Sequence, residues 1–143
     1  IYNNICILRL RMPISEDLNP KSLISKIIKY KNVINIPNSM SVLNDVLPFI
    51  NHVIDNKLIG TFNLVNSGVI THPEILELYK KYINPKYEYT IITEDKQNVL
   101  VKRSNCCLNN DKLKKYHDPG NIYTSIKDIF IDLSKNLDKY NLN

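Results

Sequence analysis

Short apolar runs with strand character alternate along this chain with longer segments of helical spacing. The strand-like runs cover 5–10, 33–36, 61–66 and 87–92, with a short extended piece at 99–101. Helical spacing covers 19–30, 42–55, 71–83, 109–116 and 122–138. This order predicts an α/β fold with a partly parallel sheet, because each helix carries the chain back to begin the next strand in the same direction.

Local signals define three of these elements more closely. The first run, ICILRL, is almost continuously apolar, which predicts a strand buried on both faces that ends before Pro13. Thr71 and Glu74 have the spacing of a capping box, in which the Thr71 oxygen accepts the N–H of Glu74 and the Glu74 side chain reaches back. Pro48 predicts a kink within the helix at 42–55.

The composition predicts one globular domain and disfavours two classes of partner. The 143 residues are 43% hydrophobic and 23% charged, as in ordinary globular proteins. The net charge is +5, but the lysines are dispersed and only three arginines are present, so we do not expect nucleic-acid binding. No apolar run approaches the ~20 residues of a membrane span. We therefore expect no membrane contact and a cytoplasmic location.

Cysteine and histidine usage does not predict a disulfide framework or a metal centre. The chain has three cysteines, two of them adjacent, and three scattered histidines. Adjacent cysteines in an extended chain point apart, whereas a structural zinc site requires ligand pairs that converge on a tetrahedron. We expect a reducing compartment and no bound metal.

The chain lacks the usual glycine-rich turn for a cofactor pyrophosphate. It has three glycines and no G-x-G-x-x-G or P-loop motif. Two Tyr-x-x-x-Lys matches, at Tyr82 and Tyr123, are what chance produces with nine tyrosines and this many lysines. The chain also opens without Met and almost directly into an apolar strand pattern. We therefore expect it to be part of a longer protein.

Two cationic side chains remain open to alternative interpretations on physical grounds. Lys26 lies between apolar positions of the first helix and is either a surface lysine or a functional one. Arg103 precedes Ser104 and Asn105, and this arrangement suits either a bound phosphate or a surface salt bridge.

Several stretches read together resemble one enzyme family. They are LRLRMPIS, NPKSLISKI, VINIPNSMSVLNDVLP, GTFNLVNSGVITHPEILELYKKYINP and KRSNCCLNNDKL, in that order. They are similar to the C-terminal half of UDP-4-keto-6-deoxyglucose 3,5-epimerase/4-reductases, the UDP-rhamnose-forming enzymes of plants and some giant viruses. More distantly they resemble dTDP-4-dehydrorhamnose reductases and other extended short-chain dehydrogenases.

The resemblance implies a particular domain organisation. Residues 1–143 would be a single unit, the C-terminal part of an NAD(P)-binding Rossmann-type enzyme, made of its last sheet strands and its sugar-nucleotide-binding domain. The cofactor-binding half would be absent from this chain. The resemblance also implies NADPH as cofactor, a UDP-sugar as substrate and a homodimer, and the AT-biased composition suits a giant-virus origin.

The resemblance assigns two sites in the first third of the chain. Lys26 matches the family's lysine that acts as acid in the epimerisation, opposite a cysteine base in the other half. Met12, Pro13 and Ile14 match the loop that packs beside the nicotinamide.

A third site follows from the resemblance near position 103. Arg103 matches the arginine that grips the UDP pyrophosphate, and Asn105 is implied as a helper. Cys106 and Cys107 depart from the family, which usually has another Asn after RSN.

The resemblance thus implies part of a bifunctional NADPH-dependent enzyme that converts UDP-4-keto-6-deoxyglucose to UDP-rhamnose. The isolated chain would be inactive. The alternative is a non-catalytic or degenerate sugar-nucleotide-binding domain.

Overall fold

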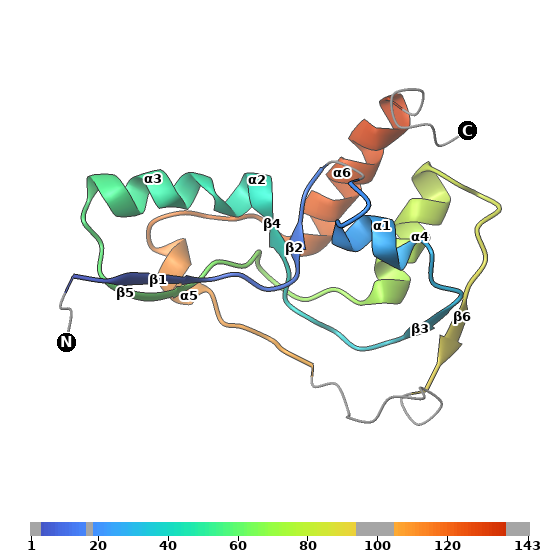
Figure 1. The fold of residues 1–143 in the computed structure, drawn as a ribbon, viewed down its shortest axis with the longest axis horizontal. Helices are drawn as coiled ribbons and strands as arrows, with labels where there is room; N and C mark the ends of the chain where they lie inside the picture. The colour runs from blue at the N-terminus through green and yellow to red at the C-terminus, as the bar shows by residue number, and fades with distance from the viewer. Residues whose placement is uncertain (1–3, 17–18, 94–104, 137–143) are drawn as a thin grey trace.

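The computed structural model describes residues 4–16, 19–93 and 105–136 as an α/β structure (Figure 1). Its strands are β1 (Cys6–Arg9), β2 (Pro13–Ile14), β3 (Asn32–Ile34), β4 (Ser41–Val42), β5 (Gly60–Asn63) and β6 (Thr90–Ile92). Its helices are α1 (Leu23–Ile27), α2 (Leu43–Val46), α3 (Pro48–Asp55), α4 (His72–Tyr82), α5 (Asp111–Lys114) and α6 (Ile122–Lys135). No described helix is long and apolar enough to cross a bilayer.

The six strands form three separate pairs, and each pair is parallel. β1 lies beside β5, β2 beside β4, and β3 beside β6. Parallel partners cannot be joined by a tight turn, so each pair encloses a long crossover that contains at least one helix. The α/β fold with parallel pairing that the sequence predicts is confirmed.

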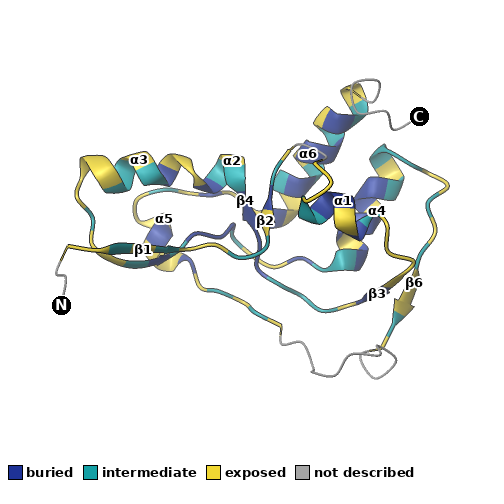
Figure 2. Cartoon of the chain, in the orientation of Figure 1, coloured by how far each residue is buried: buried dark blue, intermediate teal, exposed yellow. Residues whose placement is uncertain are grey.

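Two hydrophobic cores lie on either side of the β2–β4 pair (Figures 1 and 2). The smaller core fills the space between the β1–β5 pair, α2, α3 and α5, and its buried members are Val46, Phe49, Phe62, Leu64 and Leu113. The larger core holds α1, α4 and α6 together with the short strands β2, β3 and β4. Ile14 and Val42, on β2 and β4, belong to the larger core, so the central pair is anchored on that side.

The predicted capping box of α4 and the predicted kink at Pro48 are both present in the structure. The Thr71 Oγ1 accepts the N–H of Glu74 at 3.3 Å, and the Glu74 Oε2 accepts the N–H of Thr71 at 2.8 Å, so the capping box is confirmed. Between 42 and 55 the helix is divided into α2 and α3, and Pro48 is the first residue of α3. A proline has no N–H to donate into the preceding turn, which explains the break.

The prediction that the first strand is buried on both faces is wrong for the described structure. Cys6 and Leu8 pack against the smaller core, whereas Ile5 and Ile7, on the opposite face, are 48% and 51% exposed. Helices α2 and α3 cover one face of the β1–β5 pair (Figure 1). The other face carries the exposed side chains of Ile5 and Ile7.

Several boundaries also differ from the expectation. The first helix begins only after Ser22, whose Oγ accepts the N–H of Ser25, and it runs for five residues. The strands at 61–66 and 87–92 are shorter than expected, and the helices at 109–116 and 122–138 end earlier. The expected extended piece at 99–101 lies outside the described residues.

Candidate functional site

The loop between β1 and β2 carries the three residues expected beside a nicotinamide. Met12 has φ 44°, in the left-handed region that non-glycine residues seldom adopt, and its side chain packs partly against the larger core. Pro13 is exposed, whereas the Ile14 side chain is fully buried. Met12 and Pro13 are therefore the two of the three whose side chains offer surface to a ligand.

Helix α1, which carries Lys26, packs against β2, so Lys26 and the Met12 loop lie in neighbouring elements. Ile24 and Ile27 bury the inner face of α1, and Lys26 is exposed on its outer face. No carboxylate among the described residues lies within ion-pair distance of Lys26. The ammonium group is thus not engaged within the described chain.

The segment 105–108 reaches the same region from the far end of the chain. Asn105 is exposed, and the next residue, Cys106, forms a parallel bridge with Asn38. The Cys106 N–H donates to the Asn38 Oδ1 at 3.2 Å, and the Cys106 carbonyl accepts the N–H of Ser39 at 2.8 Å. Arg103, the expected pyrophosphate ligand, lies outside the described residues.

Asn38 is the residue at which these segments meet, and sequence reasoning missed it. Its Oδ1 accepts a second hydrogen bond at 2.9 Å, from Nη2 of Arg11, the residue before Met12. The Arg11 Nε is buried and has no hydrogen-bond partner. The only sequence signal for this role is that Asn38 belongs to IPNSM, one of the strings on which the family resemblance rests.

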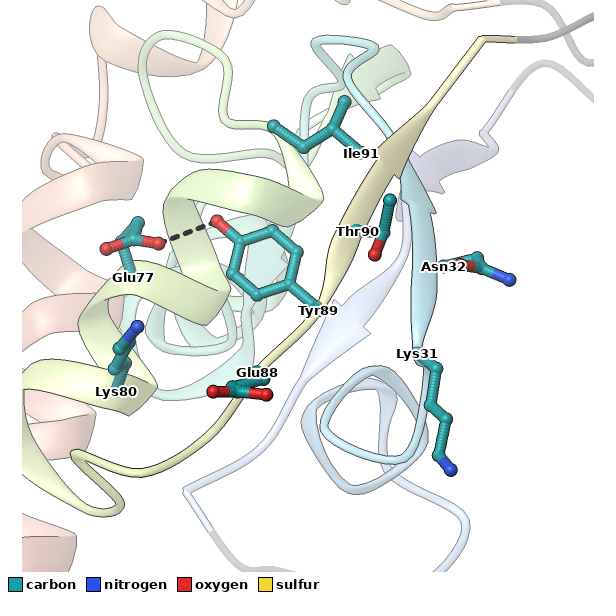
Figure 3. Close-up of a pocket in the computed structure, with 8 residues that line it drawn as sticks. All are labelled: Lys31, Asn32, Glu77, Lys80, Glu88, Tyr89, Thr90 and Ile91. Atoms are coloured by element: carbon teal, nitrogen blue, oxygen red, sulfur yellow. Dashed lines mark hydrogen bonds between the residues drawn. The ribbon is translucent and has the colours of Figure 1, made fainter.

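The structure also has an open cavity that contains none of the expected site residues. It has a volume of about 800 Å³ and lies between α4 and β6 (Figure 3). Its lining residues are Lys31, Asn32, Glu77, Lys80, Glu88, Tyr89, Thr90 and Ile91. A second cavity of about 730 Å³ shares Glu77, Tyr89 and Ile91 with it. The first cavity is therefore distinct from the region around Asn38 and the Met12 loop, whereas the second also touches Pro37, the residue before Asn38.

Tyr89 donates a hydrogen bond of 2.7 Å to the Glu77 Oε1 on α4 (Figure 3). Burial raises the pKa of Tyr89 to about 12, and the hydrogen bond to the Glu77 carboxylate and its negative charge add to the effect. Because the folded pKa lies above the ordinary value of 10.0, Tyr89 contributes stability below pH 10 that is lost as the pH rises towards 12.

A spectrophotometric titration of phenolate absorbance checks this assignment. Subtracting the Tyr89→Phe curve from the parent curve should leave one group that ionises near pH 12. Glu77→Gln should lower the pKa of that group, since it removes the carboxylate that faces the phenol. Glu88→Gln, at a lining residue that makes no hydrogen bond to Tyr89, is the matched control. A difference curve centred at pH 10 would contradict the assignment.

The described residues contain no group of three side chains suited to a metal. The three cysteines are free thiols, with Cys6 and Cys106 partly buried and Cys107 exposed. The thiols at 106 and 107 therefore form neither a disulfide nor, within the described chain, part of a metal cluster.

Comparisons with known proteins identify the relatives of the chain. No family model matches it. The chain is 46% identical over 117 residues to a trifunctional UDP-glucose 4,6-dehydratase/UDP-4-keto-6-deoxy-D-glucose 3,5-epimerase/UDP-4-keto-L-rhamnose-reductase of Arabidopsis thaliana, covering 80% of this chain and 18% of that protein. It is 44% identical over 116 residues to a bifunctional dTDP-4-dehydrorhamnose 3,5-epimerase/reductase of the same plant, covering 79% of this chain and 38% of that protein.

A solved structure of a UDP-rhamnose synthase is also similar to this chain. The L780 UDP-rhamnose synthase of Acanthamoeba polyphaga mimivirus has a TM-score of 0.81 and 36% identity, over 90% of this chain and 46% of that one. The chain thus spans less than half the length of these relatives. Fold and neighbours define an α/β chain with the fold of one part of these enzymes. The chain belongs to the family of UDP-rhamnose synthases and dTDP-4-dehydrorhamnose reductases, and it matches a part of such an enzyme.

Proposed function

We propose that the chain is the C-terminal, sugar-nucleotide-binding part of an NADPH-dependent enzyme that converts UDP-4-keto-6-deoxyglucose to UDP-rhamnose. One observation carries the proposal. The Met12 loop, α1 with Lys26 and the segment that begins at Asn105 are remote in sequence, yet they gather around β2, β4 and Asn38. These are the segments that the family resemblance assigns to cofactor, catalysis and substrate.

In this proposal Lys26 supplies a proton during epimerisation. Removal of a proton next to the C4 ketone leaves an enolate, and a new proton must then arrive on the opposite face of the sugar ring. An exposed ammonium group with no carboxylate partner in the described chain is free to approach that face. The base on the other face, a cysteine by family resemblance, would come from the half that this chain lacks.

The Met12 loop fits one side of a nicotinamide. The thioether of Met12 and the ring of Pro13 form an apolar surface next to the catalytic helix. NADPH would supply the hydride for the C4 ketone, and the pyrophosphate of the cofactor would be bound outside this chain, which has no glycine-rich turn.

The β1–β5 pair offers a docking surface for the cofactor-binding half. Four exposed apolar residues gather on and beside this pair: Ile5, Ile7, Leu10 and Ile59. Among the described strands, β1 has a partner on one edge only. A further parallel strand from a Rossmann-type half would pair with the open edge, and its helices would cover the apolar face.

The decisive experiment is a reaction with the full-length enzyme. Incubation with UDP-4-keto-6-deoxyglucose and NADPH should form UDP-rhamnose and consume one NADPH for each molecule of product. Tight binding of UDP without any turnover would overturn the proposal in favour of a non-catalytic sugar-nucleotide-binding domain. Light scattering of the same sample tests the homodimer, and fractionation of the host cell tests the cytoplasmic location.

Arg103 tests the substrate half of the proposal. Arg103→Ala should raise the KM for the UDP-sugar by about 10- to 150-fold, because it removes a charge-assisted contact worth ~1.5–3 kcal/mol. Arg103→Lys should reverse only a part of this increase in KM, since an ammonium group cannot form the bidentate contact that a guanidinium makes with a phosphate. Lys102→Ala removes the neighbouring charge and is the control. An unchanged KM in Arg103→Ala would end the pyrophosphate assignment.

A further inference from the structure

The segment 38–41, with the sequence NSMS, lies between the Met12 loop and the segment 105–108 and is hydrogen-bonded to both. We propose that Asn38, Ser39 and Ser41 are positioning residues that hold the cofactor-side loop and the substrate-side segment in a fixed relation. The inference rests on the proposed function, and it adds residues to which the family resemblance gave no role.

Asn38 is bonded to both sides at one atom. Its Oδ1 accepts from Nη2 of Arg11 at 2.9 Å and from the N–H of Cys106 at 3.2 Å, which uses both lone pairs of the carbonyl oxygen. These contacts span 27 and 68 residues of sequence. A displacement of either loop therefore disturbs the atom that holds the other.

Ser39 and Ser41 each form hydrogen bonds to one of the two segments. Ser39 binds the substrate-side segment alone, since its N–H donates to the Cys106 carbonyl and its Oγ accepts the N–H of Leu108 at 2.9 Å. Ser41 binds the cofactor-side loop alone, since its Oγ accepts the N–H of Arg11 at 3.0 Å.

The NSMS segment is rigid enough to act as a reference for both loops. Ser39 and Ser41 are 1% and 0% exposed, so water does not compete for their hydroxyl groups. The backbone of Asn38 exchanges two hydrogen bonds of 3.0 Å with Ile70, and the Ser41 Oγ donates to the Leu64 carbonyl at 2.7 Å. Both loops are thereby fixed to the body of the domain.

Arg11 depends on this arrangement for its orientation. Its Nε is buried and unpartnered, and among the described residues the guanidinium is bonded only to Asn38. The bond from Nη2 to Asn38 therefore sets the direction of the side chain that immediately precedes Met12. Loss of the Asn38 amide would free Arg11 to turn towards other acceptors and would release the loop beside the nicotinamide.

Steady-state kinetics of the full-length enzyme separate positioning from simple structural support. Ser41→Ala should raise the KM for NADPH about five- to tenfold and leave the KM for the UDP-sugar near the parent value. Ser39→Ala should raise the KM for the UDP-sugar and leave the KM for NADPH near the parent value. Asn38→Ala should raise both KM values. Asn38→Asp keeps the Oδ1 acceptor and should bring both KM values most of the way back to those of the parent.

Several results would overturn the inference. One is a fall in kcat alone, equal in all three alanine variants, because a structural role lowers the amount of active enzyme without separating the two substrates. Another is Asn38→Ala with both KM values unchanged. If Asn38→Ala fails to fold, the opposite effects of the two serine variants still decide the matter, because each removes one hydroxyl group.

Amide hydrogen exchange distinguishes failure of this inference from failure of the proposed function. In the full-length protein without substrate, exchange at Leu108 should accelerate in Ser39→Ala, and exchange at Arg11 should accelerate in Ser41→Ala. Those changes together with no UDP-rhamnose formation in the parent would reject the proposed function and retain the hydrogen-bond coupling. UDP-rhamnose formation together with unchanged exchange would reject the coupling alone.

Discussion

Lys26→Ala is expected to abolish the conversion of UDP-4-keto-6-deoxyglucose to UDP-rhamnose and to leave hydride transfer to an already epimerised substrate intact. The loss should be about 10²–10⁴-fold in kcat, the usual contribution of one general acid. Because α1 keeps its buried face of Ile24 and Ile27 in the variant, the fold should be unaffected. The measurement is product formation from each of the two substrates, with incorporation of solvent deuterium into the sugar as a direct readout of epimerisation.

Lys29→Ala is the matched control for this experiment. Lys29 is also exposed and lies two residues beyond the end of α1, so the variant removes the same charge from a neighbouring position. It should keep nearly the full rate. Unchanged UDP-rhamnose output from Lys26→Ala, or an equal loss in both variants, would remove Lys26 from the mechanism.

Asn66→Ala is expected to destabilise the fold by about 2–6 kcal/mol. Asn66 is 1% exposed, and its Oδ1 accepts the N–H of Val42 at 2.8 Å. Its Nδ2 donates to the Asp45 carboxylate and to the Pro119 carbonyl, each at 2.6 Å. Truncation leaves the two buried groups, the Val42 N–H and the Pro119 carbonyl, without this partner, and each unsatisfied buried group costs about 1–3 kcal/mol.

Urea unfolding measures the effect, with Asn44→Ala as the control. Asn44 is an exposed asparagine on α2, and its replacement should change the free energy of unfolding by less than ~0.5 kcal/mol. A loss below 1 kcal/mol in Asn66→Ala would show that neighbouring groups or water replace the amide. It would contradict the view that Asn66 ties the end of β5 to α2 and to the start of α6.

The elements that the sequence predicts well are those defined by neighbouring residues. The capping box of α4 depends on Thr71 and Glu74, and the division of the helix at 42–55 depends on Pro48 alone. The short strands β2 and β4 were missed, since two residues carry no periodicity and Pro13 is typical of a strand end. Their pairing depends on a register between distant segments, which local sequence does not encode.

Some residues of the candidate site could be predicted from the sequence, and others could not. Family resemblance gave Lys26, the Met12 loop and Asn105, and the structure brings their segments together; their chemical roles stay predictions. The roles of Asn38 and Asn66 could not be derived from sequence, because a polar residue in a loop-like string has the same pattern whether it is solvated or buried. Each binds partners more than twenty residues away.

The parallel pairing of all three strand pairs has a consequence for how the chain acquires its structure. β1 ends at Arg9, but its partner β5 begins only at Gly60. Similarly β3 ends at Ile34, and its partner β6 begins only at Thr90. At a synthesis rate of about 5–20 residues per second, β1 leaves the ribosome several seconds before it can pair. During that interval its Ile5 and Ile7 are open to any unpaired strand nearby. Contacts this distant in sequence also slow folding, so the protein should fold in milliseconds to seconds and benefit from chaperones that shield nascent apolar strands.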